Sequence, residues 1–170
     1  IEQRIVKRML DLFISLIGVI LTSPFMAICA LAVKLCDGGP VFYKQKRVTE
    51  NGREFSVLKF RTMIVDAEKK SGSVWAAKDD DRITPVGKVL RKLRLDELPQ
   101  LLNILHGEMS VVGPRPEREE LIREFEKQYP EFRYRLKVKA GLTGLAQIMG
   151  KYNTTPLDKL MMDLEYIEKY

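Results

Sequence analysis

Two adjacent carboxylates, Asp96 and Glu97, follow the basic stretch 91–94 in the middle of the chain. An ionised carboxylate can attack a phosphoanhydride and form an acyl phosphate. A second carboxylate can help to hold Mg²⁺, which takes one or two protein carboxylates together with substrate phosphates. The pair is therefore a candidate site for chemistry on a phosphorylated substrate. On its own, however, an Asp-Glu pair is more typical of a well-capped amphipathic helix.

The two carboxylates are predicted to lie at the start of a helix. Asp96 is expected to be the N-cap, with Glu97 and Pro99 in the first turn, where proline loses no hydrogen bond. The helix N-terminus favours anions and keeps Asp96 ionised. Adjacent helical side chains point about 100° apart, so the two carboxylates can have different roles. The apolar stripe of this helix is Leu98, Leu101, Leu102 and Leu105, and the helix ends near Gly107, with His106 as a C-terminal cap rather than a catalyst.

Cationic side chains elsewhere could contact a phosphate. Lys59 and Arg61 share one face of a predicted strand over residues 53–63, because strand side chains alternate. A solvated strand edge with lysines that oppose aggregation is the alternative. Arg115 lies between two prolines that restrict its backbone, and its planar guanidinium suits phosphate or uracil-like contacts. A proline-rich turn with an exposed arginine is the competing interpretation of that segment.

The remaining periodicity predicts the elements that position these residues. An Asn51-Gly52 turn joins the strand at 53–63 to a preceding strand at 41–48. Two glycines, Gly141 and Gly144, indicate close backbone approach. Residues 67–81 are predicted as a polar loop with Trp75 as an anchor, and no metal site is inferred from its acidic residues 79–81. The other expected elements are a basic amphipathic helix at 86–93, a buried strand at 109–112, and amphipathic helices at 117–129 and 157–167.

Residues 12–33 contain no charged side chain. The length of this run is sufficient for a helix to cross a bilayer, which takes ~20 residues. Ser23 and Pro24 interrupt the middle of this run, and both flanks are basic. Proline disfavours a continuous helix, and the positive-inside rule opposes moving either flank across the membrane. We therefore expect a re-entrant hairpin in which the Ser23 hydroxyl satisfies a backbone group at the break. A straight transmembrane helix and a buried helix of a soluble protein are the alternatives.

Composition narrows the class of protein. The net charge of +6 indicates an anionic partner, namely a membrane surface, a nucleic acid or a phosphorylated substrate. A nucleic-acid-binding domain fits the charge but leaves the apolar hairpin unexplained. The two cysteines, Cys29 and Cys36, form no disulfide framework and favour a reduced, cytosol-facing protein. The chain begins at Ile1 without methionine and is interpreted as part of a longer protein.

The predicted fold class is mixed α/β, mostly helical. It combines an N-terminal re-entrant helix-break-helix hairpin, residues 1–36, with one cytosolic catalytic domain, residues 37–170. The catalytic domain is expected to contain a small β-hairpin or sheet and several amphipathic interfacial helices.

Four motifs, in this order, resemble the bacterial sugar transferase family, the monotopic polyprenol-phosphate phosphoglycosyl transferases. They are Lys-Phe-Arg-Thr-Met at 59–63, Leu-Asp-Glu-Leu-Pro-Gln at 95–100, Gly-Pro-Arg-Pro at 113–116 and Gly-Leu-Thr-Gly-Leu-Ala-Gln at 141–147. The resemblance covers nearly the whole chain. The third motif is more similar to the large-form members, which carry additional N-terminal membrane helices and a soluble domain.

The resemblance implies transfer of a phospho-sugar from a UDP-sugar to undecaprenyl phosphate, with release of UMP, at the inner face of the cytoplasmic membrane. It makes Asp96 the nucleophile on the sugar-side phosphate, which gives a covalent aspartyl-phospho-sugar intermediate, and Glu97 the Mg²⁺-associated residue. The implied substrate-binding residues are Lys59, Arg61, Arg91, Arg115 and Gln147.

The expected partners are a UDP-sugar, undecaprenyl phosphate and inner-membrane lipid, without nucleic acid, and a homodimer is left open. Such a transfer is the first membrane step of exopolysaccharide or O-antigen assembly, with UDP-glucose or UDP-galactose favoured as donor. Lys151 departs from the family, which usually has arginine there. A non-enzymatic basic adaptor at the membrane surface is the alternative function.

Overall fold

The computed structural model describes residues 2–67, 80–150 and 154–169. Trp75, Asp79 and Lys151 lie outside them. The chain divides into two compact units: unit 1 comprises Ile1–Gly18, Gln45–Val57 and Leu101–Tyr170, and unit 2 comprises Val19–Lys44 and Leu58–Gln100. The fold is mixed α/β and mostly helical, with two small sheets among the described residues, which confirms the predicted class at this level.

Helix α1 (Glu2–Asp37) contributes its first half to unit 1 and its second half to unit 2. It is long and apolar enough to cross a membrane, judged by length and composition. Its large apolar side chains are mostly exposed, among them Phe13, Ile20 and Phe25. An exposed apolar helix of this kind is expected where lipid replaces water as the solvent.

The helix continues through Pro24, so the predicted break at this residue is not seen as an interruption of the helix. Pro24 has no N–H for the carbonyl of Ile20 four residues earlier. The Ser23 hydroxyl donates to that carbonyl at 2.9 Å, which confirms the role expected for Ser23. The hydroxyl thus satisfies the carbonyl that proline leaves without a backbone donor.

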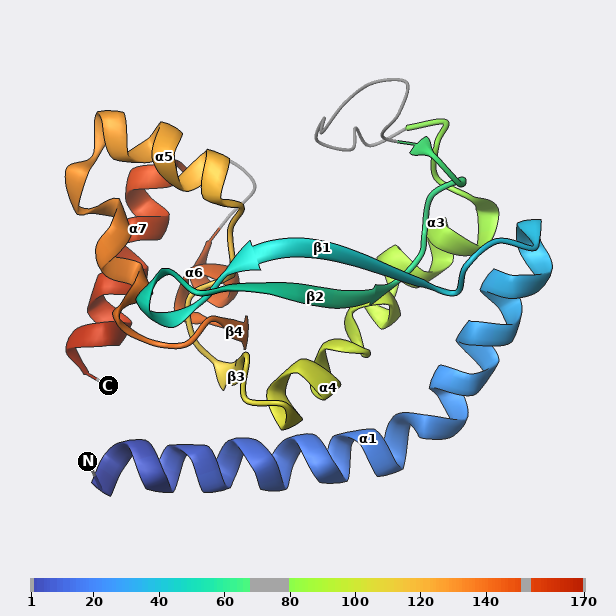
Figure 1. Ribbon diagram of the computed structural model, residues 1–170, viewed down its shortest axis with the longest axis horizontal. Helices are drawn as coiled ribbons and strands as arrows, with labels where there is room; N and C mark the ends of the chain where they lie inside the picture. The colour runs from blue at the N-terminus through green and yellow to red at the C-terminus, as the bar shows by residue number, and fades with distance from the viewer. Residues whose placement is uncertain (1, 68–79, 151–153, 170) are drawn as a thin grey trace. The chain divides into compact units, whose positions relative to one another are not determined.

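Strands β1 (Phe42–Val48) and β2 (Glu54–Phe60) form a hairpin, drawn in cyan to green in Figure 1. The predicted turn is confirmed, because the short 3-10 helix η1 (Glu50–Gly52) holds Asn51 and Gly52 at φ values of 60° and 75°. Asparagine and glycine tolerate this left-handed backbone better than other residues.

Unit 2 is built around a small apolar core. Helix α3 (Pro85–Lys92) begins at Thr84, whose side chain accepts a hydrogen bond from the backbone N–H of Gly87. Leu90 of α3 is buried, whereas Val89 is exposed. The helix therefore packs one face on the unit and leaves another open. The buried residues of this core are Cys29, Val33, Phe60 and Leu90.

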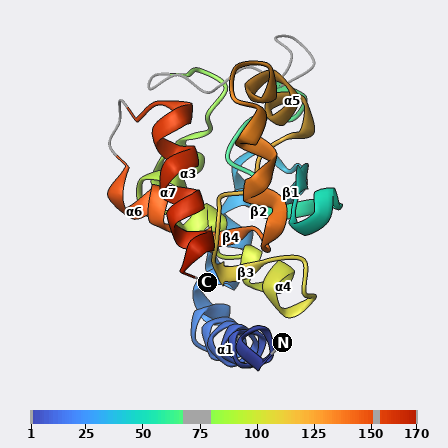
Figure 2. The same ribbon diagram turned by 90° about the vertical axis from the view of Figure 1, so that its left-hand side faces the viewer.

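Unit 1 has a second core, in which α5 (Glu119–Gln128), the 3-10 helix η3 (Pro130–Lys137) and α7 (Pro156–Glu168) pack together (Figure 1). Its buried residues are Val48, Ile122, Phe132 and Leu160. The short helix α6 (Leu145–Met149) lies beside α7 (Figure 2). Strands β3 (Ser110–Val112) and β4 (Gly141–Thr143) pair in parallel, with Ser110 opposite Gly141.

The face that α7 buries agrees only in part with the periodicity of residues 157–167. That periodicity places Leu160 and Met161 on the apolar face, and Leu160 is buried, but Met161 is exposed and Asp163 is buried instead. Asp163 is tolerated inside because Arg135 pairs with it at 2.6 Å. Sequence periodicity identified the helix but not the charge pair that determines which side faces inward.

Candidate active site

The two candidate carboxylates lie on a tight turn of unit 2. Helix α3 ends at Lys92, and Arg94 then adopts a left-handed backbone with φ 59°. This residue starts the 3-10 helix η2 (Leu95–Glu97), after which α4 (Gln100–Leu105) begins. The prediction that Asp96 is the N-cap is therefore wrong. The left-handed turn at Arg94 starts the helical run earlier, and Asp96 lies within it.

Glu97 pairs with Lys59. The Lys59 ammonium donates to the Glu97 carboxylate at 2.9 Å, and both side chains are largely buried. Charged pairs in partly buried sites are screened less by water and salt than surface pairs. The contact brings the end of β2 onto η2, so that two of the predicted site residues meet directly.

Asp96, unlike Glu97, has no direct ion pair within the described residues. Burial raises the pKa of the Asp96 carboxyl, Lys59 lowers it, Glu97 raises it and Arg91 lowers it. Within the described residues, no side chain hydrogen-bonds to this carboxyl. A carboxylate that is desolvated but has no hydrogen-bonding side chain retains nucleophilic lone pairs, while the two cations favour its ionised form.

Arg91 lies close to the carboxylates but is held from another direction. Its Nε donates to the Thr62 hydroxyl at 2.8 Å. Thr62 in turn lies against α3, because a Cβ on Gly87 would come within 2.1 Å of the Thr62 carbonyl oxygen. The glycine lets the segment after β2 approach α3 closely, and this approach positions Arg91.

Arg61 has a different environment from Lys59. Its guanidinium makes a bidentate ion pair with Asp37 at the end of α1, and it also donates to the carbonyls of Pro40 at 2.6 Å and Met63 at 3.0 Å. Hydrogen bonding to Arg61 lowers the pKa of Asp37 to about 2. Arg61 thus ties the end of α1 to the segment after β2, and a phosphate contact for it stays a prediction.

In unit 1, the turn that carries Arg115 is held by hydrogen bonds to successive carbonyl groups. The Pro114 carbonyl accepts from the Gly141 N–H at 2.8 Å. The Arg115 carbonyl accepts from Arg135 at 3.2 Å, and the Pro116 carbonyl accepts from Arg47 at 3.2 Å. This backbone, which we call the arginine turn (residues 113–116), is fixed from several sides, so the Arg115 side chain projects from a preorganised base.

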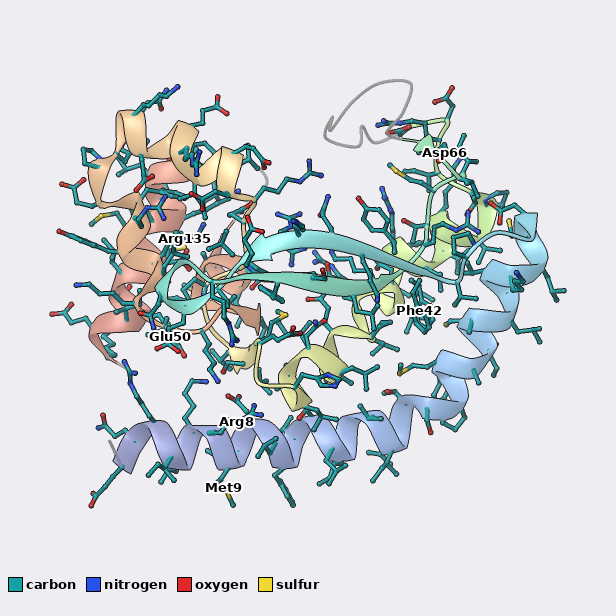
Figure 3. All side chains as sticks on the ribbon, in the orientation of Figure 1. Arg8, Met9, Phe42, Glu50, Asp66 and Arg135 are labelled. Carbon is teal, nitrogen blue, oxygen red and sulfur yellow. The ribbon has the colours of Figure 1, made fainter. Side chains whose placement is uncertain are left out.

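Arg135 is itself fixed by a buried ion pair. Its guanidinium donates through Nε at 3.0 Å and Nη2 at 2.6 Å to Asp163, and it lies over the Phe132 ring at 4.8 Å from the centroid. Figure 3 labels Arg135 among the side chains of unit 1. Burial raises the pKa of Asp163, and Arg135 opposes that rise. Breaking one partner of such a pair leaves a buried charge uncompensated.

The glycines of the last motif bring Gln147 beside the arginine turn. A Cβ on Gly141 would lie 2.1 Å from the Gly113 nitrogen, and one on Gly144 would lie 2.2 Å from the Gly113 oxygen. These distances confirm the predicted close backbone approach. Gln147 donates to the Leu142 carbonyl at 3.2 Å, and its buried Oε1 has no hydrogen-bond partner among the described residues.

A metal ion would find few ligands in the described part of the chain. No group of three or more His, Cys, Asp and Glu side chains gathers there. Asp96 and Glu97 provide two adjacent carboxylates, which suits Mg²⁺ only when substrate phosphates complete its coordination. Because Glu97 binds Lys59, a metal would have to share or replace that contact.

The predicted site residues thus form two groups, one in each unit. Lys59, Arg61, Arg91, Asp96 and Glu97 belong to unit 2. Arg115 and Gln147 belong to unit 1. Within unit 2, Lys59 and Glu97 are in contact and Arg61 is turned to Asp37. Within unit 1, the arginine turn and the Gln147 segment lie side by side.

Sequence reasoning missed the residues that support these groups. Asp163 carried a signal, since it is an acid three residues after Leu160 on the face expected to be apolar. An acidic residue at a core-facing position indicates a buried cation as its partner, and in the structure this partner is Arg135.

His106 was predicted correctly as a C-terminal cap, because its Nδ1 donates to the Leu102 carbonyl at 2.7 Å.

Comparison with known proteins identifies similar chains in several bacteria. The chain is 40% identical over 168 residues to the UDP-N-acetylgalactosamine-undecaprenyl-phosphate N-acetylgalactosaminephosphotransferase of Aeromonas hydrophila, covering 97% of this chain and 40% of that protein. It is 40% identical over 178 residues to the exopolysaccharide production protein ExoY of Sinorhizobium fredii, covering 96% of this chain and 77% of that protein.

A third relative is the UDP-glucose:undecaprenyl-phosphate glucose-1-phosphate transferase of Klebsiella pneumoniae, 43% identical over 161 residues, which cover 94% of this chain and 34% of that protein. The chain thus spans well under half the length of two of these relatives. The family model for bacterial sugar transferases matches residues 2–170. With nearly the whole chain matched, this protein belongs to the bacterial sugar transferase family.

Proposed function

We propose that the chain is the catalytic part of a phosphoglycosyl transferase that moves a sugar phosphate from a UDP-sugar to undecaprenyl phosphate and releases UMP. The observation that carries this proposal is the pair of carboxylates on η2, with Glu97 neutralised by Lys59 at 2.9 Å and Asp96 desolvated beside it. The names of the relatives support the same reaction class.

In the proposed reaction, a carboxylate oxygen of Asp96 attacks the sugar-side phosphorus of the UDP-sugar. The phosphorus–oxygen bond to the UMP phosphate breaks, and UMP leaves with the electron pair. A phosphate oxygen of undecaprenyl phosphate then attacks the same phosphorus, and the Asp96 carboxylate is released. The product is undecaprenyl diphosphate sugar, and the protein returns to its starting state.

The cations have separate roles in this scheme. Lys59 and Arg91 lower the pKa of Asp96, and so they favour the ionised nucleophile. Arg115, on its preorganised turn, is proposed to contact the nucleotide side of the donor. Glu97 would hold Mg²⁺, which when bound neutralises negative charge on the phosphate oxygens.

We further propose that α1 enters and leaves the inner membrane on the cytosolic side. The support is local: the proline in mid-helix, the hydrogen bond from the Ser23 hydroxyl to the Ile20 carbonyl and the basic residues on both flanks.

Cysteine labelling tests on which side of the membrane the two ends of α1 lie. Cys36, exposed near the end of α1, is one native position for this labelling. An Arg4→Cys variant in a Cys36→Ser background is the other. Impermeant thiol reagents should label both positions only from the cytosolic side, and labelling from opposite sides would establish a true crossing.

The reaction is tested by intact mass spectrometry of the protein mixed with Mg²⁺ and UDP-glucose, UDP-galactose or UDP-N-acetylgalactosamine, without lipid acceptor. The expected result is a mass increase of one phospho-sugar with the accepted donor. The increase should be absent in Asp96→Asn and retained in the matched control Asp81→Asn. An adduct that persists in Asp96→Asn contradicts the assignment of the nucleophile. Loss of the adduct on adding undecaprenyl phosphate, with formation of undecaprenyl diphosphate sugar, tests the second half of the reaction.

A further inference from the structure

A second group of cations lies in unit 1 and contains none of the residues assigned to sugar transfer. Arg8 of α1 and Lys139, which precedes β4, converge on Gly107 at the end of α4. Arg8 Nη2 lies 3.4 Å, and Lys139 Nζ 3.9 Å, from the point that a Cβ on Gly107 would occupy. Arg53 adds a third positive charge close enough to act on Lys139.

The acidic residues in this region have other partners. Glu50 pairs with Arg4 at 3.3 Å. Asp11 accepts hydrogen bonds from the Ser110 hydroxyl at 3.0 Å and from the Val111 N–H at 2.9 Å, and it also faces Lys7. These carboxylates therefore do not neutralise all of the positive charge around Gly107.

Lys139 is the least compensated of these cations. It is half-buried, and within the described residues its ammonium has neither a hydrogen bond nor an ion pair. Burial lowers the pKa of Lys139, and the charges of Arg8 and Arg53 lower it further, while Glu50 and Asp11 oppose them. A desolvated ammonium without a counter-ion is costly, and an anion that binds there removes part of that cost.

The surroundings of Lys139 are preorganised for such an anion. The Arg8 guanidinium is held in place by the carbonyls of Ile104 at 2.7 Å and Leu105 at 3.0 Å. Gly107 has φ +84°, a conformation suited to glycine, and the absent side chain leaves space between the two cations. A planar guanidinium and an ammonium that converge on one point suit the oxygens of a phosphate group.

The position on α1 indicates where the phosphate comes from. Met9 and Leu10, which follow Arg8 directly, are 64% and 53% exposed and belong to the apolar surface of the helix. Figure 3 shows Arg8 pointing from α1 towards the other elements of unit 1, whereas Met9 points away from them. Cations next to exposed apolar side chains lie at the depth of lipid headgroups when a helix enters a bilayer.

We propose that Arg8 and Lys139, converging on Gly107, form a binding site for the phosphate of an anionic membrane lipid. The lipid source rests on the proposed membrane placement of α1, whereas the phosphate site itself does not. The site would hold the first half of α1 at a defined depth, because a lipid headgroup would join the helix to the segment before β4.

The test uses the full chain in bilayer discs and measures the acylation rate of each lysine by mass spectrometry. Three conditions are compared: phosphatidylcholine alone, phosphatidylcholine with phosphatidylglycerol, and phosphatidylcholine with inorganic phosphate. Phosphatidylglycerol should slow the acylation of Lys139 roughly tenfold more than that of Lys34, because a hydrogen bond between charged groups contributes about 1.5 kcal/mol beyond the general effect of an anionic surface. Lys34, at the other end of the apolar segment, reports the general effect of an anionic surface, and exposed Lys127 on α5 reports reagent activity.

Slowing of Lys139 beyond that of Lys34 supports the lipid site. Equal slowing of the two lysines, or no slowing under any condition, overturns it. Protection by inorganic phosphate without protection by phosphatidylglycerol retains the phosphate site and overturns the lipid source. These readings are independent of sugar transfer, because no donor is present.

A second measurement uses variants. A ligand that binds the folded state raises the midpoint of thermal unfolding. Phosphatidylglycerol should raise this midpoint for the native chain and for Lys127→Gln but not for Lys139→Gln. An equal rise in both variants contradicts the site. If Lys139→Gln does not fold, the acylation rates of the native chain decide the proposal.

Discussion

At the scale of single residues, the two neighbouring carboxylates of η2 are distinguished by their partners. Glu97 has a lysine at hydrogen-bond distance, and Asp96 has burial and two nearby cations. Lys59 therefore acts on both: it neutralises Glu97 directly and lowers the pKa of Asp96 from a distance. One side chain thus connects the proposed metal-binding and nucleophilic roles.

This connection predicts a pH effect. Lys59→Gln removes a positive charge that lowers the pKa of Asp96 and removes the ion pair between Lys59 and Glu97, whose charge raises that pKa, so the pKa of Asp96 should rise. The nucleophile must be ionised to react. With a higher pKa of Asp96, the rate of adduct formation should therefore begin to fall at a higher pH in the variant than in the native chain as the solution is acidified. The rate of the mass increase, measured with the accepted UDP-sugar across the acidic range, checks this shift.

Lys59→Arg retains the positive charge and should keep most of the native profile. Lys88→Gln removes an exposed charge of α3 and serves as the matched control. An acid limb that is unchanged in Lys59→Gln, with the adduct still forming, would show that Lys59 does not act on Asp96.

At the scale of elements, the arginine turn is held by hydrogen bonds from β1, η3 and β4. Arg135 of η3 depends in turn on Asp163 of α7. Helix α7 therefore contributes to the base of the arginine turn without supplying any predicted site residue. Its role in the proposed reaction is positioning through Arg135.

The effect of this buried pair on stability can be separated from its effect on the turn. Asp163→Asn leaves Arg135 buried without a counter-ion and should destabilise the fold by about 3 kcal/mol or more. The double variant Arg135→Met with Asp163→Leu should recover most of that stability, because an apolar pair of similar volume can replace a buried ion pair. It should still lose the hydrogen bond to the Arg115 carbonyl.

For the double variant, we expect KM for the UDP-sugar to rise roughly tenfold with kcat little changed, since a hydrogen bond from a charged donor contributes about 1.5 kcal/mol. Thermal unfolding and steady-state UMP release measure the two effects. A stable double variant with native KM would assign the ion pair to stability alone.

The glycines between β4 and α6 make a second prediction at this scale. Gly144→Ala would place a methyl group 2.2 Å from the Gly113 oxygen, which is a backbone atom and cannot turn away. Overpacking of this kind costs about 1–3 kcal/mol, so the midpoint of thermal unfolding should fall by roughly 5 °C. Calorimetry of the purified protein measures the change.

Gly18→Ala is the control for this substitution. Gly18 lies within α1, and a Cβ there would meet the flexible side chain of Leu101 at 3.2 Å. Alanine favours a helix over glycine, so this variant should match or exceed the native midpoint. A Gly144→Ala protein with native stability and native UMP release would mean that the close approach is not required.

At the scale of the whole molecule, two properties favour membrane association, namely the net charge of +6 and the exposed apolar surface of α1. They predict different responses to salt. Charge attraction is screened at high ionic strength, whereas burial of apolar side chains in lipid is not.

We therefore expect the protein to stay with isolated membranes after a wash in about 1 M NaCl, where the Debye length is ~3 Å, and to need detergent for release. Immunoblots of pellet and supernatant measure this partition. Release by salt alone would favour the alternative function of a basic adaptor bound to the membrane surface by charge, and it would contradict the proposed insertion of α1.

The sequence by itself determined much of the local structure. The Asn51-Gly52 turn, the helix at 86–93 and the close approach of Gly141 and Gly144 depend on backbone preferences of nearby residues, and these were predicted correctly. The order of the four motifs was also sufficient to predict the family, which the matched model confirms.

Only the tertiary structure decided which charged groups meet. Arg61 and Lys59 share a strand face in the sequence pattern, yet Arg61 pairs with Asp37 and Lys59 with Glu97. The pairing of Arg135 with Asp163, and the convergence of Arg8 and Lys139 on Gly107, likewise join residues far apart in the chain. Periodicity assigns side chains to a face, but the partner of a charge is selected by packing between elements, where burial makes an unpaired charge costly.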